Sequence, residues 1–258
     1  MTQKPDIRWL KVTDSTNNRA LEGIPTEKDK TVWAAEFQTA GRGQRGNKWT
    51  SAEAQNLMFS ILLKPDFILA KDQFIVSVIV TLGLESYLKT KGVETKIKWP
   101  NDIYAQDRKI CGILIEHGIS GDMLSSSVCG IGLNINQKEF PKDLPNPTSL
   151  ILELERNGKK DQPAFSLTDE LEELVSEIYR FYDKAREEFA RTGKYDSLYK
   201  FYLERLYRKD EFHRYIETAS NKEVEARIIG LSDTACIVLE YCDGSRKSFA
   251  FKEISYII

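Results

Sequence analysis

The chain has 258 residues, of which 41% are hydrophobic and 29% are charged, and its net charge is −2. This composition is ordinary for a folded protein with one large and one small domain, and it excludes a globally basic surface that recruits nucleic acid. No apolar run approaches the roughly 18–20 residues of a membrane span, and the polar first eight residues lack the apolar core of a signal peptide.

We therefore expect a cytoplasmic protein that binds neither nucleic acid nor membranes. The four cysteines show no C-x-x-C spacing and lie in apolar or strand-like surroundings, so we predict buried free thiols in a reducing compartment; they are Cys111, Cys129, Cys236 and Cys242. A zinc site is not expected, because the chain has only two histidines.

Residues 7–12 alternate between apolar and polar side chains and predict a strand. Asp14-Ser15-Thr16-Asn17 then offers several N-caps for a short helix through residue 21. Capping alone explains such a cluster. The functional alternative is that its hydroxyls and backbone N–H groups face a polar ligand. From the residues alone we favour capping.

A predicted strand at residues 31–38 enters the segment Gly41-Arg42-Gly43-Gln44-Arg45-Gly46. Glycines allow the backbone to approach a ligand closely, and arginines offer forked donors for phosphate or carboxylate, so this segment predicts an anion-wrapping loop. Its G-x-G-x-x-G spacing also occurs in dinucleotide folds and kinases. However, a strand-like run at residues 56–63 follows instead of a helix, no H-R-D motif is present, and Gly46 is followed directly by Asn47 instead of the lysine of a phosphate-binding P-loop.

Residues 71–89 predict a core-facing helix, and Lys98-Trp99-Pro100-Asn101-Asp102 comes after it. Pro100 interrupts regular structure, so Lys98, Asn101 and Asp102 should be presented at a strand end, although Asn-Asp after proline is also an ordinary turn. Residues 106–108 predict a hairpin turn between strands, with the returning strand at residues 109–116.

Residues 123–136 predict another strand, which contains Gly130 and Gly132. Glycines inside a strand mark the close approach of a ligand or of another backbone. Asn134 and Asn136 should share one face of this strand. Three prolines in residues 137–148 then predict an irregular loop that orders on binding.

Two core helices are predicted at residues 167–189 and 195–206. Beyond residue 211, short strand-like runs predict a small all-β domain; they cover residues 212–217, 223–229, 235–241 and 246–251. We therefore expect a catalytic domain at residues 1–208 and a small β-domain at residues 209–258.

Five motifs stand in an order that resembles biotin protein ligase, and the resemblance extends from about residue 7 to the end of the chain. They are Asp14 to Asn17, Gln38 to Trp49, Lys98 to Asp102, Arg108 to Glu116, and Gly130 to Asn136. The resemblance implies an α+β fold, in which a mixed β-sheet with helices, related to class II aminoacyl-tRNA synthetases, precedes a small Src-homology-type β-barrel. It also implies an enzyme that makes biotinyl-5′-AMP from biotin and MgATP and passes biotin to a lysine of a biotin carboxyl carrier protein.

The resemblance assigns roles residue by residue. Biotin-binding positions are Ser15, Thr16, Asn17, Gln38, Gly41, Arg42, Gly43, Gln44, Lys109, Gly112 and Gly130. ATP-binding positions are Arg42, Arg45, Trp49, Lys98, Asn101, Lys109, Asn134 and Asn136. Arg42, Lys109 and Asp102 are the candidate catalytic residues, with Asp102 as the acceptor of the incoming lysine's proton. No resident metal and no prosthetic group are implied.

Two positions depart from the family's arginine-rich loop, because Gln44 and Asn47 stand where relatives often have arginine. Gln44 keeps donors but loses charge, which predicts faster loss of biotinyl-AMP. The predicted strand before Ser15 begins near residue 7, so no DNA-binding repressor domain is expected. A homodimer through the sheet is left open.

Two alternatives stand beside this hypothesis. A lipoate–protein ligase has a related fold and chemistry, and a non-catalytic biotin sensor would bind biotin without ligating it. The segment from Lys98 to Asp102 and the terminal β-domain favour biotin over lipoate. The cations Arg42, Lys98 and Lys109 argue against a sensor, because retention of biotin alone does not require them.

Overall fold

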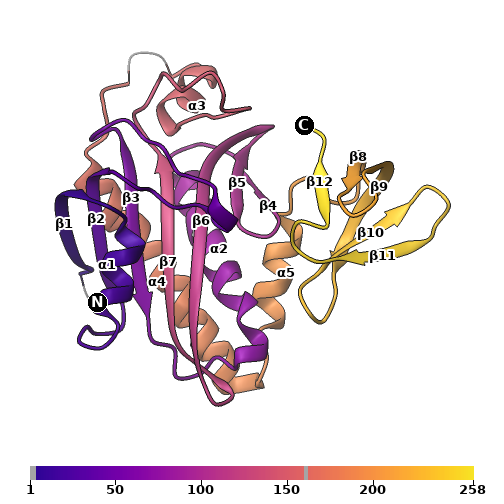
Figure 1. Cartoon of the computed structure of the whole chain (residues 1–258), viewed down its shortest axis with the longest axis horizontal. Coiled ribbons are helices and arrows are strands. Elements are labelled where there is room, and N and C mark those ends of the chain that lie inside the picture. The colour runs from indigo at the N-terminus through magenta and orange to yellow at the C-terminus, as the bar shows by residue number, and fades with distance from the viewer. Residues whose placement is uncertain (1–3, 160–161) are drawn as a thin grey trace.

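The computed structural model describes residues 4–159 and 162–258, with Arg45 described by its backbone alone. A seven-stranded sheet with helices on its faces forms the larger part of the molecule, and a five-stranded sheet forms the smaller part beside it (Figure 1). The predicted fold class, a mixed sheet with helices followed by a small β-domain, is confirmed.

The larger sheet is mixed because one pair of its strands is parallel. Strand β1 (Asp6–Thr13) runs parallel to β2 (Thr31–Gln38), and every other neighbouring pair is antiparallel. The order is β1-β2-β3-β7-β6-β5-β4, with β3 at Asn56–Leu63, β4 at Lys96–Lys98, β5 at Asp102–Ala105, β6 at Arg108–Ser120 and β7 at Met123–Asn134. All eight residues of β3 are buried, as its continuous apolar run predicts for a strand covered on both faces.

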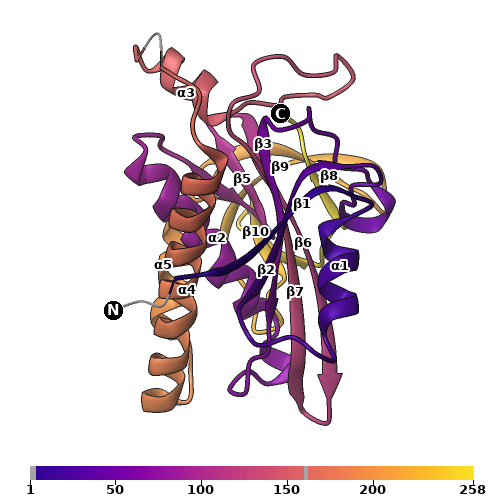
Figure 2. The ribbon, with the colours of Figure 1, turned by 90° about the vertical axis from the view of Figure 1, so that its left-hand side faces the viewer.

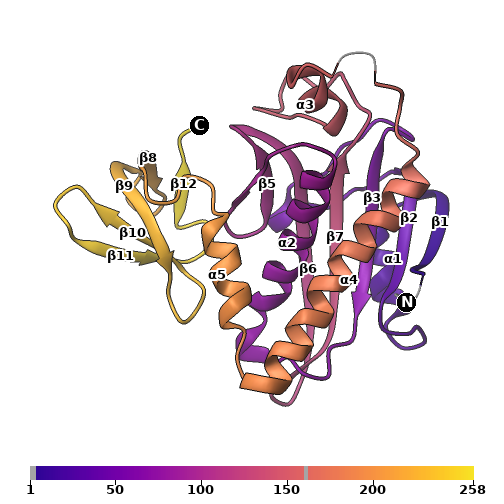
Figure 3. The same cartoon turned by 180° about the vertical axis from the view of Figure 1, so that it is seen from behind.

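Helices cover both faces of this sheet. Helices α2 (Phe74–Thr90), α4 (Leu167–Thr192) and α5 (Asp196–Glu204) lie on one face, and α1 (Thr16–Gly23) lies on the other (Figures 2 and 3). The Ser166 side chain accepts a hydrogen bond from the backbone N–H of Asp169 and so begins α4. Gly193, in a left-handed conformation, ends it.

The smaller sheet is antiparallel, with the order β11-β10-β9-β8-β12. Its strands are β8 (Phe212–Glu217), β9 (Lys222–Leu231), β10 (Ile237–Tyr241), β11 (Arg246–Phe249) and β12 (Ile254–Tyr256). The indole N–H of Trp99 donates to the carbonyl of Ala235 at 3.1 Å, and the guanidinium of Arg208 donates to that of Ile257 at 2.7 Å. These bonds tie the two parts together; a domain boundary between residues 208 and 209 stays a proposal.

Two short elements escape the sequence prediction. They are β12 and the helix α3 (Leu150–Arg156), both of seven residues or fewer, for which periodicity carries little information. The short strands β4 and β5 agree with the predicted strand end at Lys98 and the predicted hairpin at residues 106–108. The predicted strand at residues 123–136 ends at Asn134, and the predicted helix at 71–89 begins at Phe74, after a 3-10 turn at Ala70–Asp72.

All four cysteines are free, as predicted, but the prediction that all are buried is wrong for two of them. Cys111 and Cys129 are buried in β6 and β7, where burial raises the pKa of both thiols. Cys236 is half-buried, and Cys242 is exposed because it lies in the hairpin turn between β10 and β11. Within the described residues, no helix is both long enough and apolar enough to cross a membrane.

Replacing Gly83 with alanine should destabilise the protein, although the same change usually stabilises a helix interior by up to about 1 kcal/mol. Gly83 lies at the contact of α2 with α4, where an added Cβ would meet Ile178 Cα at 2.7 Å. A backbone atom cannot move away from the new Cβ as the end of a flexible side chain can. We therefore expect the free energy of unfolding, measured by denaturant titration, to fall by about 1–3 kcal/mol. Gly230→Ala is the control, because a Cβ there would have no atom of the described residues within 4 Å. Equal stability of both variants would contradict the prediction.

Candidate active site

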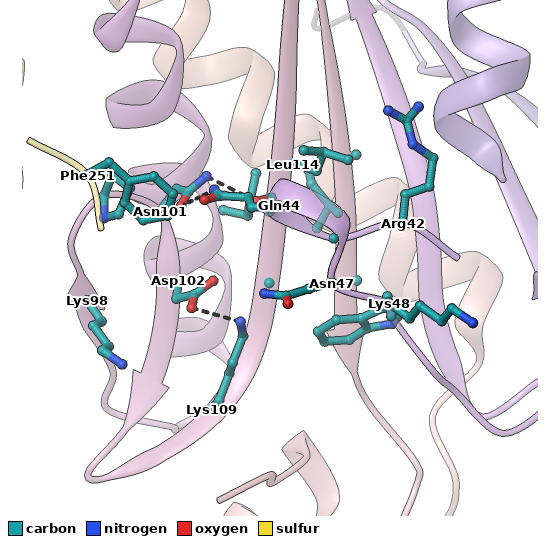
Figure 4. A pocket seen from close by; sticks show the side chains of 18 of the residues that line it. Arg42, Gln44, Asn47, Lys48, Lys98, Asn101, Asp102, Lys109, Leu114 and Phe251 are labelled. Carbon is teal, nitrogen blue, oxygen red and sulfur yellow. Dashed lines mark hydrogen bonds and ion pairs between the residues drawn. The ribbon is translucent and has the colours of Figure 1, made fainter. Parts of the chain in front are cut away.

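A cavity of about 390 Å³ opens on the larger sheet, beside the smaller one. The loop that follows β2, the turn between β4 and β5, the strands β6 and β7, and residues 251–256 of the smaller part line it (Figure 4). Its size is that of a small-molecule site. Most of the residues predicted for binding therefore meet in one place, although they come from segments far apart in the chain.

Glycines in β6 and β7 make room for Trp49 in the wall of this cavity. Gly112 and Gly132 lie opposite each other in the two strands. A Cβ on Gly132 would lie 2.3 Å from the Trp49 ring, and one on Gly112 would lie 2.8 Å from it. The indole Nε1 of Trp49 is buried and has no hydrogen-bond partner within the described part of the chain, so it is an unsatisfied donor in the wall of the cavity.

One end of the cavity is lined by uncharged polar groups. Ser15, Thr16 and Asn17 come from the start of α1, and Gln38 comes from the end of β2. The Gln38 side-chain oxygen accepts from the backbone N–H of Thr16 at 2.8 Å. Ser15 stands at the N-cap position but makes no side-chain capping hydrogen bond. Capping alone, which the residues favoured, therefore does not account for Ser15, whose side chain lines the cavity instead.

Asn17 is held from two sides. Its side-chain oxygen accepts from Ser60 Oγ at 2.6 Å, and its Nδ2 donates to Glu116 Oε2 at 2.9 Å. A Cβ on Gly130 would lie only 1.9 Å from the Asn17 oxygen, so glycine at that position allows the amide to reach the cavity.

The other end of the cavity carries charge. Lys109 Nζ lies 2.7 Å from a carboxylate oxygen of Asp102, and each side chain is about one-third exposed (Figure 4). Lys98 lies opposite Asp102 in the β4–β5 pair, and the turn between these strands contains a cis peptide bond between Trp99 and Pro100. The structure thus brings Lys98, Asp102 and Lys109 together at one end of the cavity. Of these three, the sequence predicts that Lys98 and Asp102 are presented at a strand end.

Lys98 is a half-buried cation, whose Nζ donates a hydrogen bond to the Tyr104 hydroxyl at 3.2 Å. Its Nζ lies 4.8 Å from the centre of the Tyr104 ring and 4.9 Å from that of Tyr256, and no carboxylate of the described residues lies within salt-bridge distance of it. Burial lowers the pKa of Lys98 to about 8, and the neighbouring charge of Lys109 acts in the same direction. Lys98 is therefore a cation that a phosphate group would stabilise.

The glycine loop (residues 41–46) follows β2 and contacts the sheet through two of its side chains, Gln44 and Arg42. Gln44, in the short 3-10 turn η1 (Gln44–Gly46), donates to the side-chain oxygen of Asn101 at 2.8 Å and to the carbonyl of Ile113 at 3.2 Å. The guanidinium of Arg42 lies 2.7 Å from a Glu116 carboxylate oxygen and points away from Lys109 (Figure 4).

Three of the predicted positions that the structure describes do not line the cavity. Gly41 lines a neighbouring cleft, and the prediction for Arg45 concerns a side chain outside the described part of the structure. The side-chain amides of Asn134 and Asn136 donate to the carbonyls of Thr148 and Phe165, each at 2.9 Å. These two asparagines hold the chain that follows β7, and a role for them with ATP stays a prediction.

Other lining residues escape the sequence prediction. Leu114 follows Gly112 by two residues in β6, and Glu116 follows by two more next to the loop, so strand alternation could have indicated both. No local pattern indicates the contribution of the smaller part, whose lining residues are Phe251, Lys252, Ile254, Ser255 and Tyr256. Within residues 4–159 and 162–258, no three histidine, cysteine or carboxylate side chains gather as a metal site would need.

Comparison with known proteins shows which family this sequence matches. Residues 9–134 match the biotin/lipoate A/B protein ligase family. The bifunctional ligase/repressor BirA of Bacillus subtilis is 38% identical over 133 residues, which are 50% of this chain and 37% of that protein. The biotin–[acetyl-CoA-carboxylase] ligase of Paracoccus denitrificans is 35% identical over 127 residues, 48% of this chain and 52% of that protein. This chain thus spans about two-fifths to half of the length of these relatives.

A solved structure matches over nearly the whole chain. The biotin protein ligase from Aquifex aeolicus, in complex with biotin and ATP, superposes with a TM-score of 0.74 at 26% identity and covers 97% of both chains. The matched region therefore includes the cavity and the smaller sheet that borders it.

Proposed function

We propose that this chain, which belongs to the biotin protein ligase family, is an ATP-dependent ligase that joins biotin to a lysine of a biotin carboxyl carrier protein. In the first step, a carboxylate oxygen of biotin bonds to the α-phosphorus of MgATP, and pyrophosphate leaves. In the second step, the lysine amine attacks the acyl carbon of biotinyl-5′-AMP, an amide forms and AMP leaves. Magnesium enters with ATP as part of the substrate.

The observation that carries this proposal is the division of one cavity into two chemically different ends. At one end, Ser15, Thr16, Asn17 and Gln38 offer neutral donors and acceptors. At the other, Lys98 and Lys109 offer positive charge. A ligand with a neutral polar ring and a carboxylate fits this division. Its ring would lie at the uncharged end, and its carboxylate would point to the lysines, where it would react with a phosphate.

Each end has a physical role in that reaction. A buried cyclic urea needs hydrogen-bond partners, since leaving it unpaired would cost on the order of 2–7 kcal/mol in the harshest reference states. Lys109 would reduce the repulsion between carboxylate and phosphate and stabilise the charge that develops during transfer. Asp102, already beside Lys109, is the candidate acceptor of the proton that the attacking amine releases. Trp49, which lines the cavity, would form part of the nucleotide end.

The same division separates the alternatives. Lipoate carries a ring without hydrogen-bonding nitrogen or oxygen, so it would leave the neutral polar end unpaired. A sensor of biotin alone would not need Lys98, a cation that burial makes costly in the absence of an anion.

Biotin-dependent exchange of labelled pyrophosphate into ATP tests the proposal directly. Exchange with biotin but not with lipoate supports it. Exchange with lipoate alone would move the chain to the lipoate ligases. Biotin binding without exchange, together with no added thermal stabilisation by MgATP, would indicate the sensor.

The affinity for ATP should weaken at alkaline pH because Lys98 loses its proton near pH 8. If ATP needs the charged form, the KM for ATP should rise about tenfold between about pH 7 and about pH 9. The substrate's phosphates stay fully ionised over most of this range, so they do not produce the effect. Lys98→Arg keeps its charge throughout, and its KM should change less than about threefold. Identical pH profiles for both enzymes would contradict this role of Lys98.

Gln44→Arg should slow the release of biotinyl-AMP. Gln44 already donates to Asn101 and Ile113, so its donors are used by the protein and it brings no charge to an anion. An arginine has five donors and a fixed charge, and one charge-assisted hydrogen bond of about 1.5–3 kcal/mol corresponds to roughly tenfold to hundredfold slower release. Release of preformed intermediate from both proteins measures this effect, and equal rates would refute it.

A further inference from the structure

We propose that Glu116 is a positioning residue, which fixes the orientation of the Asn17 amide for ring recognition and at the same time anchors Arg42 of the glycine loop. This role rests on the proposed function and deepens it. Glu116 lies on β6, on the same face as Gly112 and Leu114, immediately beyond the uncharged end of the cavity.

The orientation of the Asn17 amide depends on Glu116 rather than on Ser60. Ser60 Oγ lies 2.6 Å from the Asn17 oxygen and 2.8 Å from Thr16 Oγ1. A hydroxyl both donates and accepts, so it tolerates either end of an amide. A carboxylate only accepts, and therefore only the Asn17 NH₂ group can face Glu116, at the observed 2.9 Å. The Leu114 carbonyl is a second acceptor for this NH₂ group, but at 3.5 Å it is the weaker one. Asn17 is buried, so no solvent replaces this contact.

The second oxygen of Glu116 holds the loop. Its Oε1 accepts from the Arg42 guanidinium at 2.7 Å, and the other arm of Arg42 donates to the Asn18 side chain at 3.0 Å. Figure 4 shows Arg42 turned away from Lys109. Glu116 thus accepts one donor with each oxygen. A glutamine has one acceptor oxygen and cannot serve both donors.

This arrangement has a consequence for specificity. A fixed amide keeps one oxygen lone pair, and one N–H whose contact with the Leu114 carbonyl is 3.5 Å long, in known positions for a ligand. This arrangement suits a cyclic urea with both N–H and C=O groups. An amide free to reverse would present the two groups exchanged in part of the molecules. A site built for hydrogen bonds rejects a ring that lacks them, but only while its own groups stay in place.

Calorimetric titration of the full chain with biotin, without ATP, tests the role. We expect Glu116→Ala to weaken biotin about tenfold and Glu116→Gln to weaken it less, because glutamine retains one acceptor. Asn18→Ala is the matched control, since it removes the other partner of Arg42 and leaves the Asn17–Glu116 contact; it should bind biotin within about twofold of wild type.

A double-mutant cycle separates positioning from general stability. If Glu116 acts through Asn17, Glu116→Ala should have no further effect on biotin affinity in an Asn17→Ala background. The role of Glu116 would be overturned if Glu116→Ala reduced biotin affinity equally in the wild-type and Asn17→Ala backgrounds, or if Glu116→Ala bound biotin like wild type. The proposed function would still stand in either case, provided that the wild-type protein binds biotin and exchanges pyrophosphate. A wild-type protein that neither binds biotin nor exchanges pyrophosphate would overturn both.

Discussion

Lys109→Met should reduce biotin-dependent pyrophosphate exchange on the order of 100-fold to 1,000-fold, the usual loss when one preorganised donor is removed from a charge-stabilising site. Methionine keeps the length of the side chain and removes its charge. Lys109 Nζ lies within the cavity at 2.7 Å from Asp102 and would lie 3.2 Å from a Cβ on Gly112. A carboxylate and a phosphate brought together here would lose the cation between them.

The Lys109 variant needs a comparison that separates catalysis from folding. The Lys109–Asp102 pair is about one-third exposed, so its loss should change the free energy of unfolding by no more than about 1 kcal/mol. Lys11→Met, an exposed lysine in β1, is the matched control and should exchange pyrophosphate like wild type. If Lys109→Met retains more than about a tenth of the wild-type rate, a direct role in charge stabilisation is refuted.

Patterns confined to neighbouring residues predict much of this molecule. The long helices α2 and α4 and the apolar strand β3 follow from periodicity, because each repeats over many residues. The prediction of an anion-wrapping loop at Gly41 to Gly46 also comes from neighbouring residues, because their composition restricts what the backbone can do. The resemblance supplies the relation between these segments that local patterns do not contain.

What stays beyond sequence reasoning depends on register between distant segments. A glycine inside a strand predicts that Gly132 lies close to some neighbour, but the sequence does not show that this neighbour is the Trp49 ring. Only the pairing of β6 with β7 places Gly112 opposite Gly132, so that both glycines make room for the ring. Asn134 and Asn136 show the converse. Their spacing predicts that they share one face of a strand, but the strand ends at Asn134. Both side-chain amides instead donate to backbone carbonyls farther along the chain.

The contribution of the smaller sheet is the least predictable part of the site. Tyr256 lies beside Lys98 although about 160 positions separate them in the chain, and no motif surrounds it. Only the packing of the two sheets against each other brings this ring to the cation. The low pKa of Lys98 is therefore a property of tertiary structure, because burial between Tyr104 and Tyr256 causes it.

Gly130→Ala should abolish tight binding of biotin by displacing Asn17. The added Cβ would lie 1.9 Å from the Asn17 oxygen and 2.6 Å from its side-chain carbon, which are impossible distances. Asn17 cannot move aside without breaking its contacts with Ser60 and Glu116. We expect affinity for biotin to fall on the order of 100-fold, with a loss of about 1–3 kcal/mol in the free energy of unfolding from the overpacked wall.

A second substitution distinguishes steric displacement from general damage to β7. Asn17→Ser in the Gly130→Ala background removes the atoms with which the new methyl group collides, so the free energy of unfolding should recover by most of the amount lost. The affinity for biotin should stay low, because the amide that the glycine accommodates is gone. If affinity recovers together with stability, Asn17 does not bind the ring, and the glycine at position 130 serves only the packing of the strand. If neither recovers, the alanine distorts β7 itself, where Gly130 pairs with Ser60 of β3 and with Leu114 of β6.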